Sequence, residues 1–375
     1  MKALVTGGTG FIGSHVVREL LTHKIPVRCL IRAASVRSNL SGLEVEYLAG
    51  DLQDAGSLRL ALKDCDRLFH VAADYRLWSL RPEELERTNV EGTRALLAAA
   101  GDAGLKKIVY TSSVAAVGRP SSPSPGLRTP SPFPPLHPGG PAKASVAGSR
   151  ERVSASPSPY LREKGQGDEG GLGHEELDPT PAQLIGPYKK SKFAAELIAR
   201  GFARQGLPVV IVNPSTPIGA QDIKPTPTGK MIVDFLNGRM PGYVDTGLNF
   251  VDVADVAAGH WLAAQKGKVG ERYILGNRNM TLKEFLEILA RISGHPAPRL
   301  RIPYAVAYLA GAASTGLSYI TRREPAIPLD GVRMAHEPMY YDASKAVREL
   351  GLPQTPIEEA LRKAVEWFRA NGYIR

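Results

Sequence analysis

The chain is 375 residues long, 43% of its residues are hydrophobic, and its formal net charge at pH 7 is +10. The hydrophobic content excludes a disordered chain, and the length suits either a nucleotide-binding domain with a smaller partner or one domain carrying an insertion. Because Lys and Arg are scattered rather than gathered on one helix, we expect no nucleic-acid partner. An anionic cofactor and an anionic or membrane-bound substrate fit this charge.

The two cysteines, Cys29 and Cys65, lie beside apolar stretches and show neither metal-ligand spacing nor a disulfide framework. We interpret them as core thiols in a reducing compartment, and we assign no metal. No charged leader followed by a long apolar run opens the chain, because the first strand already belongs to the fold. The sequence therefore predicts a cytoplasmic protein.

The first predicted element is a short strand, Ala3–Val5, which leads through TGGTGFIG into a helix. Apolar residues about one turn apart mark the buried face of this helix: Val16, Val17, Leu20 and Leu21. Gly7 permits a tight turn, Gly10 lets the backbone approach phosphates, and Gly13 lets the helix lie close to the strand. Free amide groups and the positive end of the helix dipole then face a bound anion, so the turn predicts a pyrophosphate site.

Short β-rich runs and helical stretches alternate after this turn. The expected strands are Val27–Ile31, Val45–Leu48, Arg67–Val71, Lys107–Ser112 and Val209–Asn213. The expected helices between them include Ser57–Leu62, Pro82–Ala103 and Ser191–Arg204. Alternation of strand and helix implies right-handed crossovers and a parallel sheet that is covered on both faces. We therefore predict an α/β fold with a doubly wound parallel sheet of the Rossmann type.

From residue 119 to residue 171 the alternation stops, and the sequence becomes rich in Pro, Ser and Gly with little apolar content to bury. Such a segment does not offset its ordering entropy. We expect a disordered insertion over 119–171, with a lid over the active site as the alternative. Deletion of Ser121 to Asp168 is then expected to leave folding and cofactor binding intact.

Beyond Asn213 the pattern is irregular until two amphipathic helices, Leu282–Ile292 and Ile357–Arg369. They predict a smaller domain over the strand ends, where ligands of such sheets bind. We expect residues 1–213 and about 248–280 to bind NAD(P), and residues 214–247 and 281–375 to bind substrate.

One apolar stretch, Ala305–Ile320, carries no charge but is short for a bilayer span, so no transmembrane segment is predicted. We interpret it as a buried helix. The alternative is a peripheral membrane contact, with Arg322 and Arg323 beside it.

Tyr188 and Lys192 stand one helical turn apart in YKKSK, so both side chains lie on one helix face. A cation beside a phenol stabilises the phenolate and draws its pKa toward neutrality, where proton transfer is efficient. Ser113 follows the predicted strand Lys107–Ser112, and its hydroxyl could bind a substrate oxygen. Its neighbours Thr111 and Ser112 compete for that role.

The choice of cofactor depends on the end of the second strand, where an acidic residue marks NAD and a basic residue accepts the extra phosphate of NADP. The chain has Arg32 there, followed by Arg37, and no acid nearby. A guanidinium pairs with phosphate through two parallel hydrogen bonds. We therefore favour NADP over NAD; in the alternative, Arg32 stacks on the adenine.

These motifs, in this order, resemble the extended short-chain dehydrogenases/reductases, which include the NAD-dependent epimerase/dehydratase family. The resemblance rests on TGGTGFIG, Asp51 in GDL, Ala72 and Ala73 in HVAAD, Asn89 in TNVEGT, Ser113 and YKKSK. Within that superfamily, HVAADYRLW, NPSTPIG and the stretch from KPTPTGK through YVDTGLNFVDVADVA resemble the hopanoid-associated sugar epimerases and, more distantly, the dihydroflavonol 4-reductases.

The resemblance implies a role for each matching residue. Tyr188 would be the general acid/base, Lys192 would bind the nicotinamide ribose and lower the pKa of the tyrosine, and Ser113 would polarise the reacting oxygen. The residues implied to bind cofactor are Gly7, Gly10, Phe11, Ile12, Gly13, Arg32, Asp51, Leu52, Ala72, Ala73, Asn89, Tyr188, Lys192, Pro214, Ser215 and Thr216.

Two aromatic residues after the HVAAD strand end, Tyr75 and Trp78, suit a sugar ring or polycyclic lipid, although core packing explains them equally well. The sequence thus predicts an NAD(P)-dependent oxidoreductase or epimerase acting on a small-molecule or lipid-linked secondary alcohol or ketone, in hopanoid lipid metabolism. Alternatives are a carbonyl reductase that uses NADPH, like dihydroflavonol reductases, and a non-catalytic dinucleotide-binding sensor. A homodimer would be ordinary for this superfamily.

Overall fold

The computed structural model describes residues 2–120 and 171–374, and its main feature is a parallel sheet of seven strands. Their order is β10-β6-β5-β4-β1-β2-β3, and every neighbouring pair is parallel. The strands are β1 Ala3–Thr6, β2 Val27–Ile31, β3 Glu46–Ala49, β4 Arg67–His70, β5 Lys107–Thr111, β6 Val209–Pro214 and β10 Arg272–Leu275. The predicted doubly wound fold is confirmed, and β10 extends the sheet by a strand that the sequence reading did not include.

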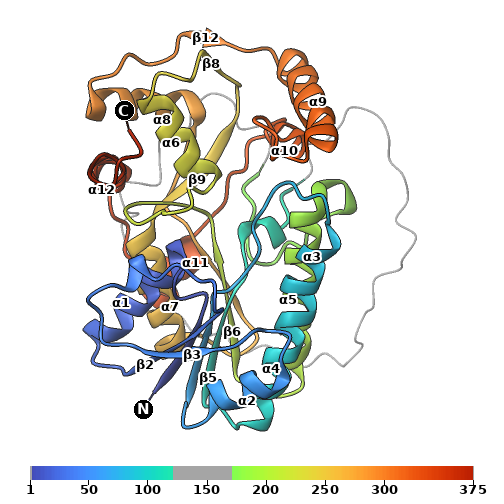
Figure 1. Cartoon of the computed structure of the whole chain (residues 1–375), viewed down its shortest axis with the longest axis vertical. Coiled ribbons are helices and arrows are strands. Elements are labelled where there is room, and N and C mark those ends of the chain that lie inside the picture. The colour runs from blue at the N-terminus through green and yellow to red at the C-terminus, as the bar shows by residue number, and fades with distance from the viewer. Residues whose placement is uncertain (1, 121–170, 375) are drawn as a thin grey trace, which may run out of the picture. The chain divides into compact units, whose positions relative to one another are not determined.

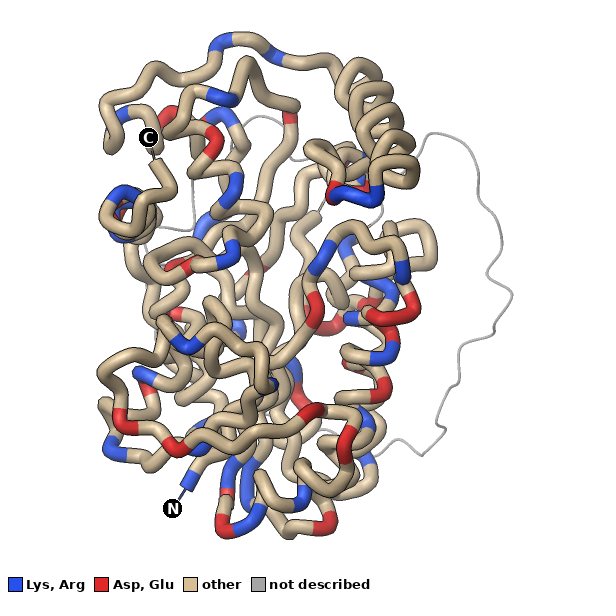
Figure 2. The backbone as a smooth tube through the Cα atoms, in the orientation of Figure 1, with Lys and Arg blue, Asp and Glu red and all other residues tan. Residues whose placement is uncertain are grey.

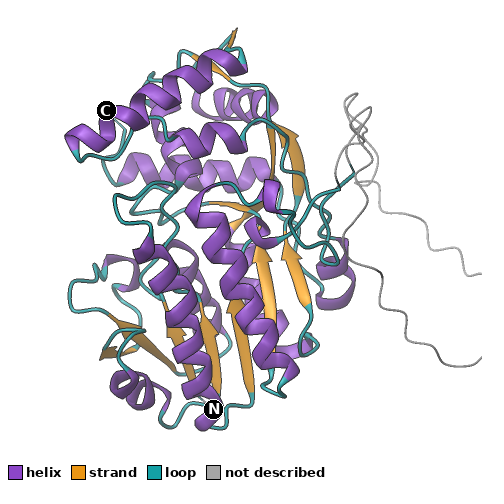
Figure 3. Ribbon diagram, turned by 90° about the vertical axis from the view of Figure 1, so that its right-hand side faces the viewer, coloured by secondary structure: helices purple, strands orange, loops and turns teal. Residues whose placement is uncertain are grey.

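Helices cover both faces of this sheet, as Figure 1 shows. One face carries α1 (Phe11–Thr22), α7 (Val253–Lys266) and α11 (Ser344–Leu350), which share a buried apolar cluster with the strands. The other face carries α2 (Ala55–Leu62), α4 (Gly92–Asp102) and α5 (Gly186–Arg204) around a second cluster. Figure 3 shows the strands between these layers running side by side. The carboxyl ends of parallel strands meet at one edge, so the predicted site residues converge there.

Two predicted helices differ substantially from the structure, one in its continuity and the other in where it begins. The stretch expected over Pro82–Ala103 consists of α3 (Glu83–Glu86), a π-helical turn over Arg87–Glu91, and α4. A π-helical turn often marks a functional position, and this one carries the buried Asn89. Helix α5 begins at Gly186 rather than at Ser191, because Pro187 occupies its first turn, where the missing N–H costs nothing.

A second region is built on a three-stranded sheet in the order β11-β9-β7. Its strands are β7 Thr216–Ile218, β9 Gly247–Asp252 and β11 Arg278–Thr281, and its helices are α6 Pro227–Leu236, α8 Leu282–Ser293 and α12 Ile357–Ala370. Stacked rings of Phe250 and Phe285, with centroids 4.4 Å apart, lie in its apolar core. Two short strands, β8 (Gly242–Tyr243) and β12 (Leu300–Arg301), pair in parallel.

The segment 248–280, expected with the nucleotide-binding part, contributes to both sheets. Helix α7 and strand β10 belong to the main sheet and its cover, whereas β9 and β11 belong to the small sheet. The described residues 2–119 and 172–374 form one compact unit. The division of this unit into a cofactor and a substrate domain stays a prediction.

The helix predicted over Ala305–Ile320 exists as α9 (Tyr304–Thr321), but its predicted burial is wrong. Only Ala307, Gly311 and Ser318 are buried, and most of its large apolar side chains are exposed. It packs mainly on the short helix α10 (Leu329–Met334), which is too small to cover it. Among the described residues no helix is long and apolar enough to cross a membrane.

Of the insertion predicted over 119–171, residues 121–170 lie outside the described residues, so its disorder, and the lid offered as the alternative, stay predictions. The described stretches before and after that segment are bonded to each other, because the amide of Gly118 donates to the carbonyl oxygen of Leu177 at 2.8 Å.

Candidate active site

The glycine turn between β1 and α1 is packed so closely that larger residues do not fit. Gly7 has a φ of +71°, and a Cβ there would lie 2.6 Å from the amide nitrogen of Ala72, just beyond the end of β4. A Cβ on Gly13 would lie 2.0 Å from the carbonyl oxygen of Gly7. Both positions therefore require glycine, for the turn and for the helix-to-turn contact respectively.

The start of α1 presents amide groups that no side chain caps within the described part of the chain. Gly10 is the N-cap residue without a side-chain hydrogen bond, and the first turn contains no acidic residue. The amides of Phe11, Ile12 and Gly13 therefore keep their donors for an anion, which the helix dipole attracts. These amide donors fit the oxygens of a bound pyrophosphate.

A segment after β7 lies against this turn and connects it to the second region. The ring nitrogen Nε2 of His15 contacts the carbonyl oxygen of Ala220 at 3.0 Å, and Asn39 donates to the carbonyl oxygen of Gln221 at 3.0 Å. Gln221 has a φ of +72°, a left-handed conformation that is uncommon for a residue other than glycine. Sequence reasoning missed this segment, because nothing in the sequence shows that it returns to α1.

Tyr188, Lys192 and Ser113 meet at the carboxyl end of β5. The Tyr188 hydroxyl lies 3.5 Å from Ser113 Oγ, and Lys192 Nζ donates to the carbonyl oxygen of Thr111 at 3.0 Å. Ser113 Oγ also accepts the amide of Ala115 at 3.1 Å, which fixes its orientation. The structure brings together the three residues that the sequence singled out as catalytic.

The structure also distinguishes Ser113 from its two competitors. The Thr111 hydroxyl is bonded to His260 Nε2 at 2.8 Å, inside the core. Ser112 Oγ is buried without a hydrogen-bond partner in the described part of the chain. Of these hydroxyls, Ser113 is the one placed to share a substrate oxygen with Tyr188.

Burial governs the pKa values of the pair. Desolvation raises the pKa of the Tyr188 phenol, and the hydrogen bond with Ser113 lowers it by less. Desolvation also lowers the pKa of Lys192 to about 8, against a raising effect of Glu196. The upward shift of the Tyr188 pKa thus follows from desolvation, and a lowering of it by Lys192 stays a prediction.

A buried charged network lies behind Ser113, and sequence reasoning missed it. Asn213 Nδ2, at the end of β6, donates to the carbonyl oxygen of Ser113 at 3.0 Å and to Glu196 Oε2 at 2.7 Å. Glu196 is fully buried and pairs through Oε1 with Arg272 Nη1 of β10 at 3.0 Å. The available signal was Glu196 itself, a carboxylate one turn beyond Lys192 on the buried face of α5.

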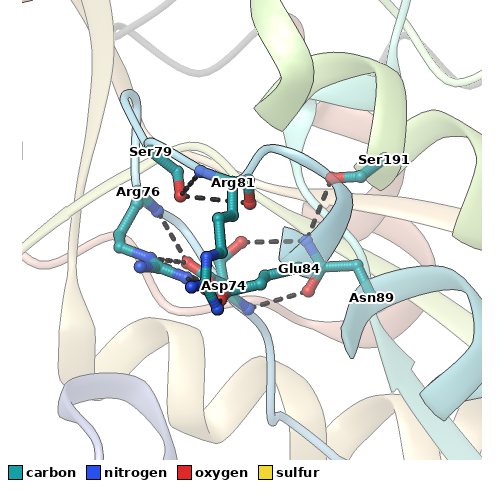
Figure 4. Close-up of polar contacts among 7 residues, drawn as sticks. All are labelled: Asp74, Arg76, Ser79, Arg81, Glu84, Asn89 and Ser191. Carbon is teal, nitrogen blue, oxygen red and sulfur yellow. Dashed lines mark hydrogen bonds and ion pairs between the residues drawn. The ribbon is translucent and has the colours of Figure 1, made fainter. Parts of the chain in front are cut away.

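Asn89 connects the loop after β4 to α5, as Figure 4 shows. Its Oδ1 accepts the amide of Asp74 at 2.7 Å, while its Nδ2 donates to the Asp74 carbonyl oxygen at 2.9 Å and to Ser191 Oγ at 3.0 Å. Arg76 closes the loop by pairing with the carboxylates of Asp74 and Glu84. Asn89 thus orients the loop that follows Ala72 and Ala73, and its contact with cofactor stays a prediction.

Arg32 lies where the NADP prediction needs it, directly after β2. Its side chain is exposed, whereas the guanidinium of Arg37 lies 5.0 Å from the ring centroid of Tyr47. Asp51 is exposed after β3, and its Oδ1 accepts the amide of Gln53 at 3.0 Å. Leu52 is buried in the apolar cluster under α2 and α4.

The remaining predicted residues line the same edge. Pro214 ends β6, Thr216 begins β7, and Ser215 Oγ between them is buried without a partner among the described residues. An orphaned hydroxyl at this point fits the polar group of a bound cofactor. Together with the glycine turn, it shows that the residues present fit a nicotinamide dinucleotide.

The two predicted substrate residues lie on the loop after β4, and they differ in exposure. Tyr75 is 43% exposed, and its hydroxyl donates to the carbonyl oxygen of Lys224 at 3.3 Å. Trp78 is half-buried, and its ring meets that of Tyr319 from α9 edge to face at 6.1 Å. The loop thus connects the catalytic edge of the sheet to α9.

Comparison with known proteins gives concordant matches. The family model "NAD dependent epimerase/dehydratase family" matches residues 3–155 and 163–276. A Synechocystis sp. protein that bears the name of a dihydroflavonol 4-reductase is 44% identical over 375 residues, covering 99% of this chain and 95% of that protein. Sterol demethylase protein B of Methylococcus capsulatus is 34% identical over 376 residues, covering 100% of both. Among solved structures, gox2253 matches with a TM-score of 0.77 and 39% identity, over 100% of this chain and 99% of that one.

Proposed function

The chain belongs to the NAD dependent epimerase/dehydratase family and is an NAD(P)-dependent enzyme, and from this premise we propose its reaction. It moves hydride between a nicotinamide dinucleotide and a secondary alcohol or ketone of a sugar-like or lipid-linked substrate. The observation that carries the proposal is the 3.5 Å contact between the Tyr188 hydroxyl and Ser113 Oγ, with Lys192 on the next helical turn.

The chain's own residues handle the substrate oxygen. When bound, the dinucleotide supplies or accepts the hydride at the reacting carbon. Ser113 donates a hydrogen bond to the oxygen, and Tyr188 gives it a proton in reduction or takes one in oxidation. Lys192 holds positive charge beside this oxygen, and Asn213 holds the Ser113 backbone in place. The raised pKa of the Tyr188 phenol keeps it protonated at neutral pH, which suits the donating direction.

For the dinucleotide, we propose that Gly7, Gly10 and the first-turn amides of α1 hold the pyrophosphate and that Arg32 selects NADP. Loss of a charge-assisted, two-bond contact to phosphate costs about 1.5–3 kcal/mol, or roughly 10- to 100-fold in affinity. Arg32→Ala is therefore expected to raise the Kd of NADP by that factor and to leave the Kd of NAD nearly unchanged. Calorimetric titration measures both constants.

Arg94→Ala is the control for this titration, because the exposed Arg94 of α4 pairs at the surface with Glu91, its one ion-pair partner among the described residues. It should bind both dinucleotides like the wild type. If wild-type protein binds NAD more tightly than NADP, the proposed preference is wrong.

For the substrate, we propose a polycyclic lipid or a sugar linked to one, in hopanoid lipid metabolism. The relative from Methylococcus capsulatus, which is named for sterol demethylation, supports a polycyclic substrate. The aromatic side chains of Tyr75 and Trp78 beside the catalytic edge offer flat surfaces for such a ring system.

A second candidate is net carbonyl reduction with NADPH, favoured by the name of the 44% identical relative. The alternative of a non-catalytic sensor does not fit an enzyme of this family. Cytoplasmic localisation and a homodimer stay predictions from the sequence.

The test uses reduced dinucleotide carrying deuterium at its transferable position, together with candidate ketones, polycyclic lipids and nucleotide sugars. Deuterium in a product, with matching consumption of dinucleotide, supports the reductase. Inversion of a substrate carbon without net consumption supports the epimerase. If neither dinucleotide binds the purified protein, the proposal fails.

A further inference from the structure

Helix α9 is amphipathic in the opposite sense to an ordinary surface helix. Its exposed side carries large apolar side chains at helical spacing, with exposed fractions of 55% for Val306, 69% for Leu309, 59% for Leu317 and 81% for Ile320. A surface helix of a globular protein normally turns such residues toward the core. We call these four residues the apolar stripe of α9.

The side of α9 that faces the protein is instead small and polar. Ser314 Oγ accepts the amide of Ile327 at 3.2 Å, and Thr315 Oγ1 accepts the amide of Leu329 at 2.9 Å. A Cβ on Gly311 would lie 3.1 Å from Val332 Cγ2, so that position lies close against α10. These contacts fix the rotation of the helix, so the exposed stripe is a consequence of how α9 is bound.

Charge flanks this helix but does not enter it. No residue from Tyr304 to Thr321 is charged, whereas Arg299 and Arg301 precede it and Arg322 and Arg323 follow it. Figure 2 shows α9 as an uninterrupted tan helix with blue segments before and after it. The neighbouring acids are Asp245, which pairs with Arg301 at 2.6 Å, Glu324, and Asp330 of α10, which pairs with Arg333 at 3.3 Å.

Helix α9 and its support also touch the catalytic part of the chain. Tyr319 meets Trp78 on the loop after β4, edge to face at 6.1 Å. Beneath α9, the Asp330 carboxylate of α10 lies against Gly186, which begins the helix that carries Tyr188. Helices α9 and α10 are therefore in contact with elements that carry the site residues.

From these observations we propose that α9 docks in the plane of an anionic lipid bilayer. Helix α9 has 18 residues and is about 27 Å long. Its uncharged length fits the acyl boundary of the bilayer, and the Arg residues at both of its ends fit the phosphate headgroups. Tyr308 and Tyr319, both exposed, provide the amphipathic rings that settle at such an interface. Docking would place the loop of Trp78 beside the membrane, where a lipid-borne substrate enters; this consequence rests on the proposed function.

Cosedimentation with vesicles of phosphatidylglycerol, compared with vesicles of phosphatidylcholine, tests the docking. Full-length protein should sediment with the anionic vesicles, bind the zwitterionic ones at least about tenfold more weakly, and lose binding in high salt. A variant with Leu309→Gln, Leu317→Gln and Ile320→Gln should lose at least about tenfold in binding. Because these side chains are exposed, its thermal unfolding should match that of the wild type.

The control variant carries the same number of Leu or Val to Gln changes at exposed positions elsewhere: Leu60→Gln, Val269→Gln and Val347→Gln. It should bind vesicles like the wild type. Absence of binding to anionic vesicles, or equal binding by the α9 variant, overturns the proposal.

Two other results would also overturn the proposed membrane docking, because each would show that something else covers the apolar stripe. If the wild type is a dimer by sedimentation equilibrium and the α9 variant a monomer, a second copy covers the stripe. If only a protein lacking residues 121–168 binds vesicles, that segment of the chain covers it. Hydride transfer to a detergent-solubilised ketone is measured in parallel, so that a failure of docking is distinguished from a failure of the proposed reaction.

Discussion

At the scale of single residues, the phenol of the half-buried Tyr188 and the ammonium of the buried Lys192 share the end of β5. Burial raises the pKa of the phenol and lowers that of the ammonium to about 8. At neutral pH the tyrosine is therefore protonated and the lysine is mostly charged. In this state Tyr188 can give a proton to an oxygen that receives hydride, while Lys192 offsets negative charge nearby.

The lowered pKa of Lys192 predicts how cofactor binding depends on pH. As pH rises through about 8, the ammonium loses its charge and its attraction for the anionic dinucleotide. The Kd of the dinucleotide should increase by up to about tenfold between about pH 7 and pH 9. Fluorescence titration of the reduced dinucleotide over this range measures it.

Two variants test whether Lys192 causes this pH dependence of the dinucleotide Kd. Lys192→Met should bind more weakly and show no such increase. Lys189→Met is the matched control, because burial lowers the pKa of Lys189 to about 8 as well. This variant should keep the increase in Kd, because Lys189 Nζ contacts Met339 Sδ instead of the end of β5. An unchanged pH profile in Lys192→Met contradicts the assignment.

At the scale of elements, the strand, turn and first helix act as one unit through glycine contacts. Gly13→Ala would place a Cβ 2.0 Å from the Gly7 carbonyl oxygen, so the turn must shift. Such overpacking costs about 1–3 kcal/mol, and a displaced turn should weaken dinucleotide binding at least about tenfold. Chemical denaturation and titration measure the two effects.

Gly201 in α5 provides the control, since a Cβ there meets nothing within 4 Å. Gly201→Ala should stabilise the protein by about 0.5–1 kcal/mol and leave binding unchanged, because alanine loses less backbone entropy in a helix. Equal binding by the two alanine variants would show that the Gly13 contact is not needed for the site.

The sequence predicted elements whose signal is local and missed those whose position depends on distant partners. The glycine turn, the strands β1 to β6 and the catalytic helix follow from short apolar patterns and chain order. The network of Asn213, Glu196 and Arg272 joins three elements and has no local signature. The exposure of α9 was mispredicted because apolar composition does not tell whether a large enough partner exists to cover a helix.

At the scale of the whole molecule, the chain on both sides of the Pro-, Ser- and Gly-rich segment belongs to one structure. A Cβ on Gly171 would lie 3.1 Å from Pro120 Cγ, so the two ends of that segment are adjacent. Deletion of Ser121 to Asp168 therefore leaves a short connection that needs no rearrangement. The shortened protein should be soluble, unfold within a few degrees of the full chain and bind dinucleotide with similar affinity.

Thermal unfolding and titration of the purified deletion protein check this expectation. Recovery only as insoluble protein, or a loss of dinucleotide binding, would show that the segment contributes to the fold or to the site. The same protein serves in the vesicle experiment on α9, so both questions are answered with one preparation.

The decisive measurement is the single-turnover rate of hydride transfer in wild-type protein and in Tyr188→Phe, at saturating dinucleotide and with its Kd determined separately. Removal of the proton donor should lower the rate by about 10²- to 10⁴-fold while the dinucleotide still binds. Tyr273→Phe, whose hydroxyl contacts Glu349 rather than Ser113, should retain the wild-type rate. A Tyr188→Phe protein that transfers hydride as fast as the wild type would contradict the assignment of this residue as the acid/base.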